Sequence, residues 1–234
     1  MALFSPLTKK RLKVLCGRLT RLHRVDVINA LLHKVKGTDY LEVGVRKGET
    51  IAGVFCQRRH GVDPVLQLDK ISPASLAPRL EDATFFEITS DEFFSVNSLK
   101  FDVVLVDGLH QYEQAIKDIL NALNCLKGNG YIVVHDCSPP TEAAAAREQG
   151  SGAWCGDTWK TMYDLHANYP TIDSFVLDGD YGLGIVSKQN REERFEPRYN
   201  EEIVGLPFSF YQEHKEEFQK LRDLAFFRDW LKKI

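Results

Sequence analysis

YLEVGVRKGET, at residues 40–50, is the stretch of this sequence that decides the fold. It opens with an apolar run of strand length and continues into an acid-x-Gly-x-x-x-Gly pattern that begins at Glu42. Glycines in such a turn let the backbone bend tightly and approach a ligand closely. Arg46 stands where the second glycine of a Gly-x-Gly-x-x-Gly fingerprint belongs, and the Gly-Lys-Ser/Thr of a P-loop is absent. The stretch therefore predicts a strand, a ligand-binding turn and a helix, without either nucleotide fingerprint.

Short apolar runs alternate with helical stretches along the chain. The runs lie at residues 40–45, around Val62, and at 84–88, 101–106 and 131–134. Unbroken apolar strands of this kind are typical of a parallel sheet that is covered on both faces. Residues 174–177 and 184–187 are expected to form two more strands around a hairpin connection at 178–182.

These patterns predict an α/β fold: a single domain with a doubly wound, mostly parallel, Rossmann-like sheet. We expect a helical extension over 1–37, the sheet-containing core over 38–188 and a helical tail over 189–234. Within the tail, 211–233 has the pattern of one amphipathic helix.

Composition bounds the function. The chain has 234 residues, of which 44% are hydrophobic and 27% charged, with a net charge of −3. These values fit one globular domain and argue against disorder, a coiled coil or wholesale nucleic-acid binding. No apolar run reaches the roughly 18 residues that span a bilayer. The five cysteines are dispersed and odd in number, which argues against a disulfide framework and favours a reducing, cytoplasmic compartment.

Two acids stand at strand ends near the glycine turn. A carboxylate at Glu42 would repel a pyrophosphate and attract an ammonium group, so the expected ligand is a nucleoside with a cationic amino-acid end. Asp63 ends the next strand, about 20 residues downstream, at the spacing where a carboxylate meets ribose hydroxyls. The alternative is a solvated turn beside two strand-end acids.

At these residues the chain resembles the class I S-adenosylmethionine-dependent methyltransferases, from about residue 40 to 187. The resemblance implies a seven-stranded sheet with an antiparallel last strand. It also implies that the glycine turn, with Glu42, Gly44 and Gly48, holds the methionine end of the cofactor and that Asp63 holds the ribose. Ser90, after the third strand, would lie near the adenine.

The next two parallel strands also end in polar residues. The fourth strand runs into Asp107 and His110, and the fifth into His135 and Asp136. Because neighbouring strand ends open on one cleft, two carboxylates and two imidazoles are expected to converge there. Such a group suits a divalent metal or a general base. Methyl transfer to oxygen needs this help, since a hydroxyl must lose its proton to become a good nucleophile.

The run DGLHQY, residues 107–112, is similar to the metal-dependent sugar O-methyltransferases of macrolide and polysaccharide biosynthesis. That resemblance implies that Asp107 and Asp136 are metal ligands and that His110 is the general base. Asp107 also remains a candidate cofactor contact or helix cap. His135 departs from the pattern, because these enzymes carry a second carboxylate there. An imidazole at this position weakens a pure Mg²⁺ interpretation and permits Mn²⁺, Fe²⁺ or no metal.

Several weaker features have two interpretations. Trp154 could contact the acceptor, and it and Trp159 could equally be core residues. Asp180 could reach the cleft from the last hairpin. Residues 9–24 carry seven basic side chains and no acid, which suits either an anionic acceptor or a solvated helix face. The apolar stripes of the terminal helices could supply a homodimer interface.

The leading hypothesis is an S-adenosylmethionine-dependent O-methyltransferase that acts on a sugar or glycoside hydroxyl, with Mg²⁺ or Mn²⁺ as an optional second cofactor. The substrate would be a small molecule or a nucleotide-linked sugar. Alternatives with the same fold are a small-molecule N- or phenol-methyltransferase and a non-catalytic cofactor-binding protein. A nicotinamide dehydrogenase is disfavoured, because Glu42 and Arg46 both oppose pyrophosphate recognition.

Overall fold

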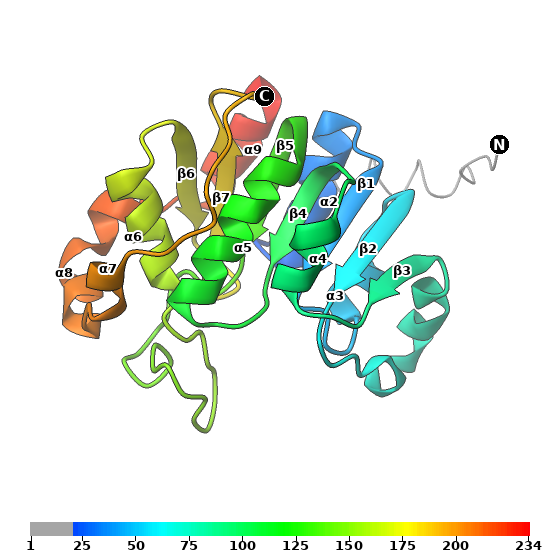
Figure 1. The fold of residues 1–234 in the computed structure, drawn as a ribbon, viewed down its shortest axis with the longest axis horizontal. Coiled ribbons are helices and arrows are strands. Elements are labelled where there is room, and N and C mark those ends of the chain that lie inside the picture. The colour runs from blue at the N-terminus through cyan, green and yellow to red at the C-terminus, as the bar shows by residue number, and fades with distance from the viewer. Residues whose placement is uncertain (1–20) are drawn as a thin grey trace.

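A seven-stranded sheet forms the centre of the computed structural model, which describes residues 21–234 (Figure 1). The strand order is β3-β2-β1-β4-β5-β7-β6. All neighbours are parallel except β7, which runs antiparallel to both β5 and β6. The strands are β1 (Asp39–Val43), β2 (Arg58–Val62), β3 (Ala83–Phe86), β4 (Phe101–Val106), β5 (Leu126–Val134), β6 (Ile172–Leu177) and β7 (Leu183–Lys188). The strand order reverses between β1 and β4, so a ligand site is expected at the carboxyl ends of these two strands.

Helices cover both faces of the sheet, as the unbroken apolar strands predict. One face carries α4 (Ser90–Val96), α5 (Tyr112–Cys125), α6 (Trp159–Asn168), α7 (Glu201–Val204) and α8 (Phe208–Gln219). The other carries α2 (Arg24–Val35), α3 (Glu49–Gly53) and α9 (Leu224–Lys233). Two short 3₁₀ segments, Leu68–Lys70 and Ala74–Leu80, connect β2 to β3. In β4, the side chains of Val104 and Val106 pack beneath α4–α8, and those of Val103 and Leu105 pack beneath α2, α3 and α9. Because successive side chains point to opposite faces and both faces are covered, both sets must be apolar.

The tail differs from the single amphipathic helix expected over 211–233. It forms two helices, because Lys220 adopts a left-handed conformation with φ of 45° and ends α8. Arg222 then pairs with the edge strand β6, its N–H donating to Val176 and its carbonyl accepting from Asp178, both at 2.8 Å. The chain thus crosses the sheet edge, so that α8 packs on one face and α9 on the other. This crossing pairs the backbone of Arg222 with the carboxyl end of the edge strand β6.

The described parts of the terminal stripes that suggest a dimer are buried within the chain. Val27, Ile28 and Leu31 of α2 are fully buried against the sheet, as are Phe218 of α8 and Phe227 of α9. The described parts of these stripes pack within the chain, and a homodimer remains a prediction. The helix expected before residue 21, with most of the basic stretch 9–24, lies outside the described residues. In the part that is described, no helix is both long and apolar enough to cross a membrane.

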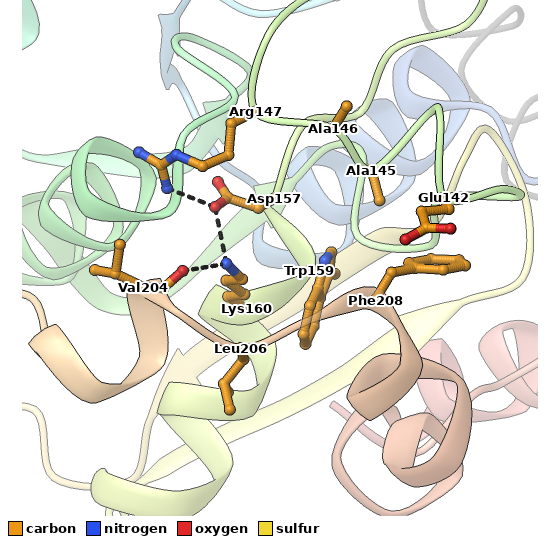
Figure 2. Close-up of a pocket in the computed structure, with 10 residues that line it drawn as sticks. All are labelled: Glu142, Ala145, Ala146, Arg147, Asp157, Trp159, Lys160, Val204, Leu206 and Phe208. Carbon is orange, nitrogen blue, oxygen red and sulfur yellow. Dashed lines mark hydrogen bonds and ion pairs between the residues drawn. The ribbon is translucent and has the colours of Figure 1, made fainter.

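A long connection, residues 135–158, joins β5 to α6 and wraps back over the start of α5. Asp157 fixes it: its backbone N–H donates to the carbonyl of His110, and its carboxylate accepts from the N–H of Tyr112 at 2.7 Å. The same carboxylate binds Arg147 and the buried Lys160 beside a cavity of about 340 Å³ (Figure 2). These charges pair with one another, so the connection is a fixed wall next to the strand ends.

Candidate active site

The glycine turn is pressed against the end of β4. Gly44 has φ of 90°, and a Cβ there would lie 2.0 Å from the backbone carbonyl oxygen of Asp107. The N–H of Asp107 donates to the carbonyl of Val43 at 2.8 Å. Only glycine allows this approach, so the backbone of the turn is in direct contact with the end of β4.

Glu42 lies beneath that turn and is almost fully buried, with 1% exposure. The hydroxyl of Tyr40 donates to its carboxylate at 2.7 Å. Burial raises the pKa of Glu42 to about 8, although the Tyr40 hydrogen bond opposes this rise. Without a cationic partner the side chain is therefore mostly protonated at neutral pH, whereas a neighbouring ammonium group would favour the carboxylate.

Asp63 and Ser90 lie at the ends of β2 and β3. The two carboxylate oxygens of Asp63 accept from the backbone N–H groups of Arg46 and Val65, each at 2.8 Å. Asp63 thus contacts the glycine turn directly and fixes its shape. Ser90 is the first residue of α4, and its hydroxyl accepts from Gln114 of α5 at 3.2 Å. The ribose and adenine roles given to these two residues remain predictions.

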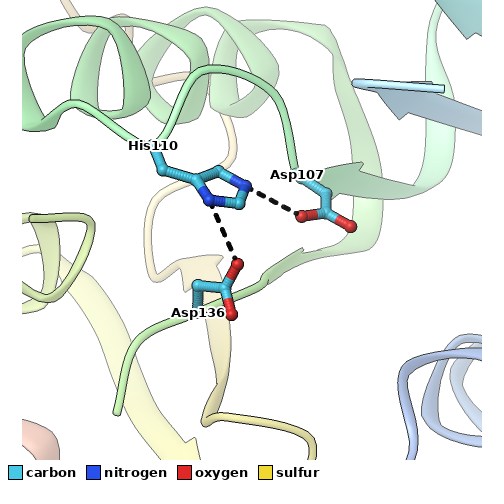
Figure 3. A group of neighbouring side chains, drawn as sticks. All are labelled: Asp107, His110 and Asp136. Carbon is cyan, nitrogen blue, oxygen red and sulfur yellow. Dashed lines mark ion pairs between the residues drawn. The ribbon is translucent and has the colours of Figure 1, made fainter. Parts of the chain in front are cut away.

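Asp107, His110 and Asp136 converge at the ends of β4 and β5 (Figure 3). Nε2 of His110 lies 3.4 Å from Asp107, and Nδ1 lies 3.3 Å from Asp136. Asp136 has φ of 61°, a strained conformation for a non-glycine residue. Gly156 of the long connection closes over His110, because a Cβ there would lie 1.8 Å from the His110 carbonyl oxygen. The imidazole is therefore held between two carboxylates.

His135 faces the same carboxylates from the core side. Its Nδ1 lies 3.2 Å from Asp107 and 3.0 Å from Asp136, and its Nε2 lies 3.4 Å from Asp180. Burial lowers the pKa of His135, but the three carboxylates outweigh burial and raise it to about 11. His135 thus pairs with all three carboxylates, and its role as a metal ligand remains a prediction.

Two further residues complete the site, and the sequence singled out neither as a principal site residue. Arg24, the first residue of α2, donates from its guanidinium to Asp107 at 2.8 Å, and its Nε lies 3.3 Å from Asp180. Asp180 comes from the β6–β7 connection, where a role in the cleft was one of two open interpretations. Burial raises the pKa of Asp107, but His135, His110 and Arg24 outweigh it and hold that pKa well below its usual range.

The two tryptophans have different places. Trp159 is 1% exposed and belongs to the core. The ring of Trp154 lies beside His110, with 4.9 Å between ring centroids, and its indole N–H donates to the carbonyl of Ala146 at 2.7 Å. Trp154 is therefore held at the edge of the carboxylate–imidazole group, while Trp159 is structural.

The donors present fit a small divalent cation. Asp107, His110 and Asp136 each offer one ligand atom, and these atoms lie within 4.8 Å of one another. Two carboxylate oxygens and one imidazole nitrogen suit Mn²⁺ or Fe²⁺, and carboxylates alone suit Mg²⁺. In such a complex His110 would be a ligand, and its metal-bound nitrogen could not also accept a proton.

The chain matches a known family over the glycine turn and the ends of β4 and β5. Residues 41–137 match the model of a family described as a methyltransferase domain, a range that includes Gly44, Asp107, His110 and Asp136. No curated protein matches the chain.

Solved structures share the fold at low sequence identity. A Klebsiella pneumoniae protein described as an O-methyltransferase is 11% identical, with a TM-score of 0.53 over 81% of this chain and 93% of its own. A Staphylococcus aureus protein described as a caffeoyl-CoA O-methyltransferase is 15% identical, with a TM-score of 0.53 over 79% and 93%. TomG from Streptomyces achromogenes, an O-methyltransferase of tomaymycin synthesis solved with S-adenosylmethionine, is 14% identical, with a TM-score of 0.50 over 81% and 82%.

These likenesses establish the Rossmann-like methyltransferase fold expected from the sequence. Together with the family match, they support a methyltransferase.

Replacing Glu42 with glutamine tests the burial of its carboxylate. The pKa of Glu42 is about 8 in the folded chain and near 4.5 when exposed, so folding favours its protonated form. The free energy of unfolding should therefore fall as pH rises from about 4.5 to about 8, and then level off. Glutamine has no proton to lose, so Glu42→Gln should match the wild type near pH 4.5 and exceed it by a few kcal/mol at pH 8.

Urea unfolding at a series of pH values measures this difference. The exposed Glu87→Gln is the matched control and should follow the wild type throughout. A constant offset between Glu42→Gln and the wild type across the pH range would contradict the raised pKa.

Proposed function

We propose that this chain is a methyltransferase that uses S-adenosylmethionine and transfers the methyl group to oxygen, on the hydroxyl of a sugar or glycoside. The observation that carries this proposal is the position of His110, held between Asp107 and Asp136 at strand ends that adjoin the glycine turn. The proposed base therefore lies close to the turn proposed to bind the methyl donor.

The glycine turn supports S-adenosylmethionine as the methyl donor. Glu42 lies beneath it as a buried acid whose ionised form needs a cation nearby, and the donor carries an ammonium group. Asp63 already shapes the turn through Arg46 and lies where ribose hydroxyls would meet it. TomG, which shares the fold, binds this donor in its crystal structure.

The carboxylate–imidazole group supports an oxygen acceptor. A hydroxyl is a weak nucleophile, and a positioned base that removes its proton as the C–O bond forms contributes about 10²–10⁴-fold in rate. Burial lowers the pKa of His110, but Asp107 and Asp136 outweigh it and raise the pKa above its usual 6.5. The neutral imidazole is therefore a stronger base than a free histidine. An amine or thiol acceptor would need less of this help.

A divalent cation is an optional part of the proposal. Asp107, His110 and Asp136 would hold it, and when bound it would lower the pKa of a coordinated hydroxyl. In the absence of a cation, Asp107 and Asp136 orient the imidazole of His110 and stabilise its protonated form.

Trp154 supports a sugar as the acceptor. Its ring lies next to His110 and its indole N–H is already bound to the carbonyl of Ala146, so a substrate at His110 would meet the ring rather than the N–H. Aromatic rings present apolar faces of about the size of a pyranose ring. A phenol would stack on the same ring, which makes phenols the acceptor class to be tested against sugars.

Calorimetry with S-adenosylmethionine and with NAD⁺ tests the donor. We expect binding of S-adenosylmethionine and none of NAD⁺, and a loss of affinity of about tenfold or more in Glu42→Gln, because the ammonium group loses its carboxylate partner. Gly150→Ala is the control, since a Cβ there meets nothing within 4 Å. Binding of NAD⁺ alone, or full affinity in Glu42→Gln, would refute the donor site.

Replacing His110 tests the base. His110→Ala should lower kcat by about 100-fold or more, while the affinity for S-adenosylmethionine stays within about threefold. His214→Ala, on the outer surface of α8, is the control for a histidine outside the site. Unchanged turnover in His110→Ala would remove His110 from the mechanism.

A panel of acceptors tests the substrate class. Free sugars, glycosides, nucleotide-linked sugars, catechols and primary amines are incubated with radiolabelled donor, with and without Mg²⁺ or Mn²⁺. We expect label in sugar or glycoside hydroxyls, and a loss of this labelling in Trp154→Ala that mainly raises KM. Labelling of amines or catechols alone would overturn the sugar assignment and leave the donor assignment intact.

A further inference from the structure

We infer that Arg24 is a built-in cation of this site, and that Arg24 and a divalent metal ion exclude each other on Asp107. The inference rests on the proposed function, because it concerns what occupies the same site. It places the first residue of α2 in competition with a metal ion for Asp107, so that metal binds weakly while Arg24 is in place.

Arg24 is fixed in the site at several points. Its guanidinium donates to Asp107 at 2.8 Å and its Nε lies 3.3 Å from Asp180. Its backbone N–H also donates to Asp180, at 2.9 Å. The side chain is only 24% exposed. The helix behind it cannot swing freely, since Val27 and Ile28 are buried against the sheet. Arg24 is therefore anchored by its side chain, its backbone and its helix.

Both oxygens of Asp107 already face other side chains while Arg24 is in place. One oxygen binds the guanidinium, and the other faces His110 at 3.4 Å and His135 at 3.2 Å. A metal ion shared by Asp107, His110 and Asp136 would lie close to the guanidinium. Two cations at such a distance repel strongly in a half-buried site, where water screens them poorly.

The balance of charge leads to the same conclusion. Three carboxylates meet here, from Asp107, Asp136 and Asp180, and Arg24 is a permanently charged side chain that pairs with two of them, Asp107 and Asp180. His23 lies 3.8 Å from Asp180 at the outer edge. Removing the guanidinium would leave excess negative charge around Asp107, which a divalent cation could neutralise.

Titration of Mn²⁺ into the full-length protein, without donor or acceptor, tests the inference. Free Mn²⁺ is followed by its electron paramagnetic resonance signal. We expect weak binding to the wild type and binding tighter by about tenfold or more in Arg24→Gln, which keeps a polar, unbranched side chain but removes its charge. Arg24→Lys should bind weakly, because it restores the charge.

Two controls locate the effect. Arg21→Gln, which removes an exposed arginine paired with Asp26, should bind Mn²⁺ like the wild type. In Arg24→Gln combined with Asp136→Asn, the gain should disappear. Thermal melting checks that each variant is folded.

Unchanged affinity in a folded Arg24→Gln, or an equal gain in Arg21→Gln, would overturn the inference. Micromolar or tighter Mn²⁺ binding by the wild type that Asp136→Asn abolishes would overturn it without any Arg24 variant. Because no methyl donor or acceptor is present, none of these outcomes bears on whether the chain transfers methyl groups.

Discussion

The site depends on one close approach of backbone to backbone. The carbonyl oxygen of Asp107 occupies the space that any side chain at residue 44 would need. Without this contact, the turn after β1 and the acids after β4 would be separate features of the sheet edge. With it, the glycine turn proposed to bind the donor and the carboxylates proposed to act on the acceptor are held together by the strand order, which reverses between β1 and β4.

Charge is the second constraint. Three carboxylates at strand and hairpin ends would repel one another in a half-buried cleft, and the fold compensates them with cations from different parts of the chain. Arg24 comes from the helix before β1, and His135 from the end of β5. The site is therefore assembled from both halves of the sheet. The compensation of its negative charge depends on the packing of α2 as well as on the positions of the strand ends.

The sequence predicts what depends on local pattern. The apolar runs locate the strands, and strand ends in a parallel sheet must meet, so the convergence of Asp107, His110 and Asp136 follows from the sheet. The position of Arg24 does not follow, because it lies 83 residues from Asp107 and its basic neighbours equally suggest a solvated face. Nor does the break at Lys220, since the heptad-like pattern continues through it and only the pairing of Arg222 with β6 requires the turn.

The geometry also explains why His110 suits the role of a base. S-adenosylmethionine is a sulfonium cation, and it becomes neutral at sulfur when its methyl group leaves. If His110 takes the acceptor proton, the positive charge passes from the donor to the imidazole, and the net charge of the cleft does not change. Asp107 and Asp136 lie 3.4 and 3.3 Å from the two ring nitrogens, where they stabilise that imidazolium as it forms. A buried site that conserves its charge during the reaction has little need to reorganise, and under the proposed function the two fixed carboxylates around one histidine would serve this purpose.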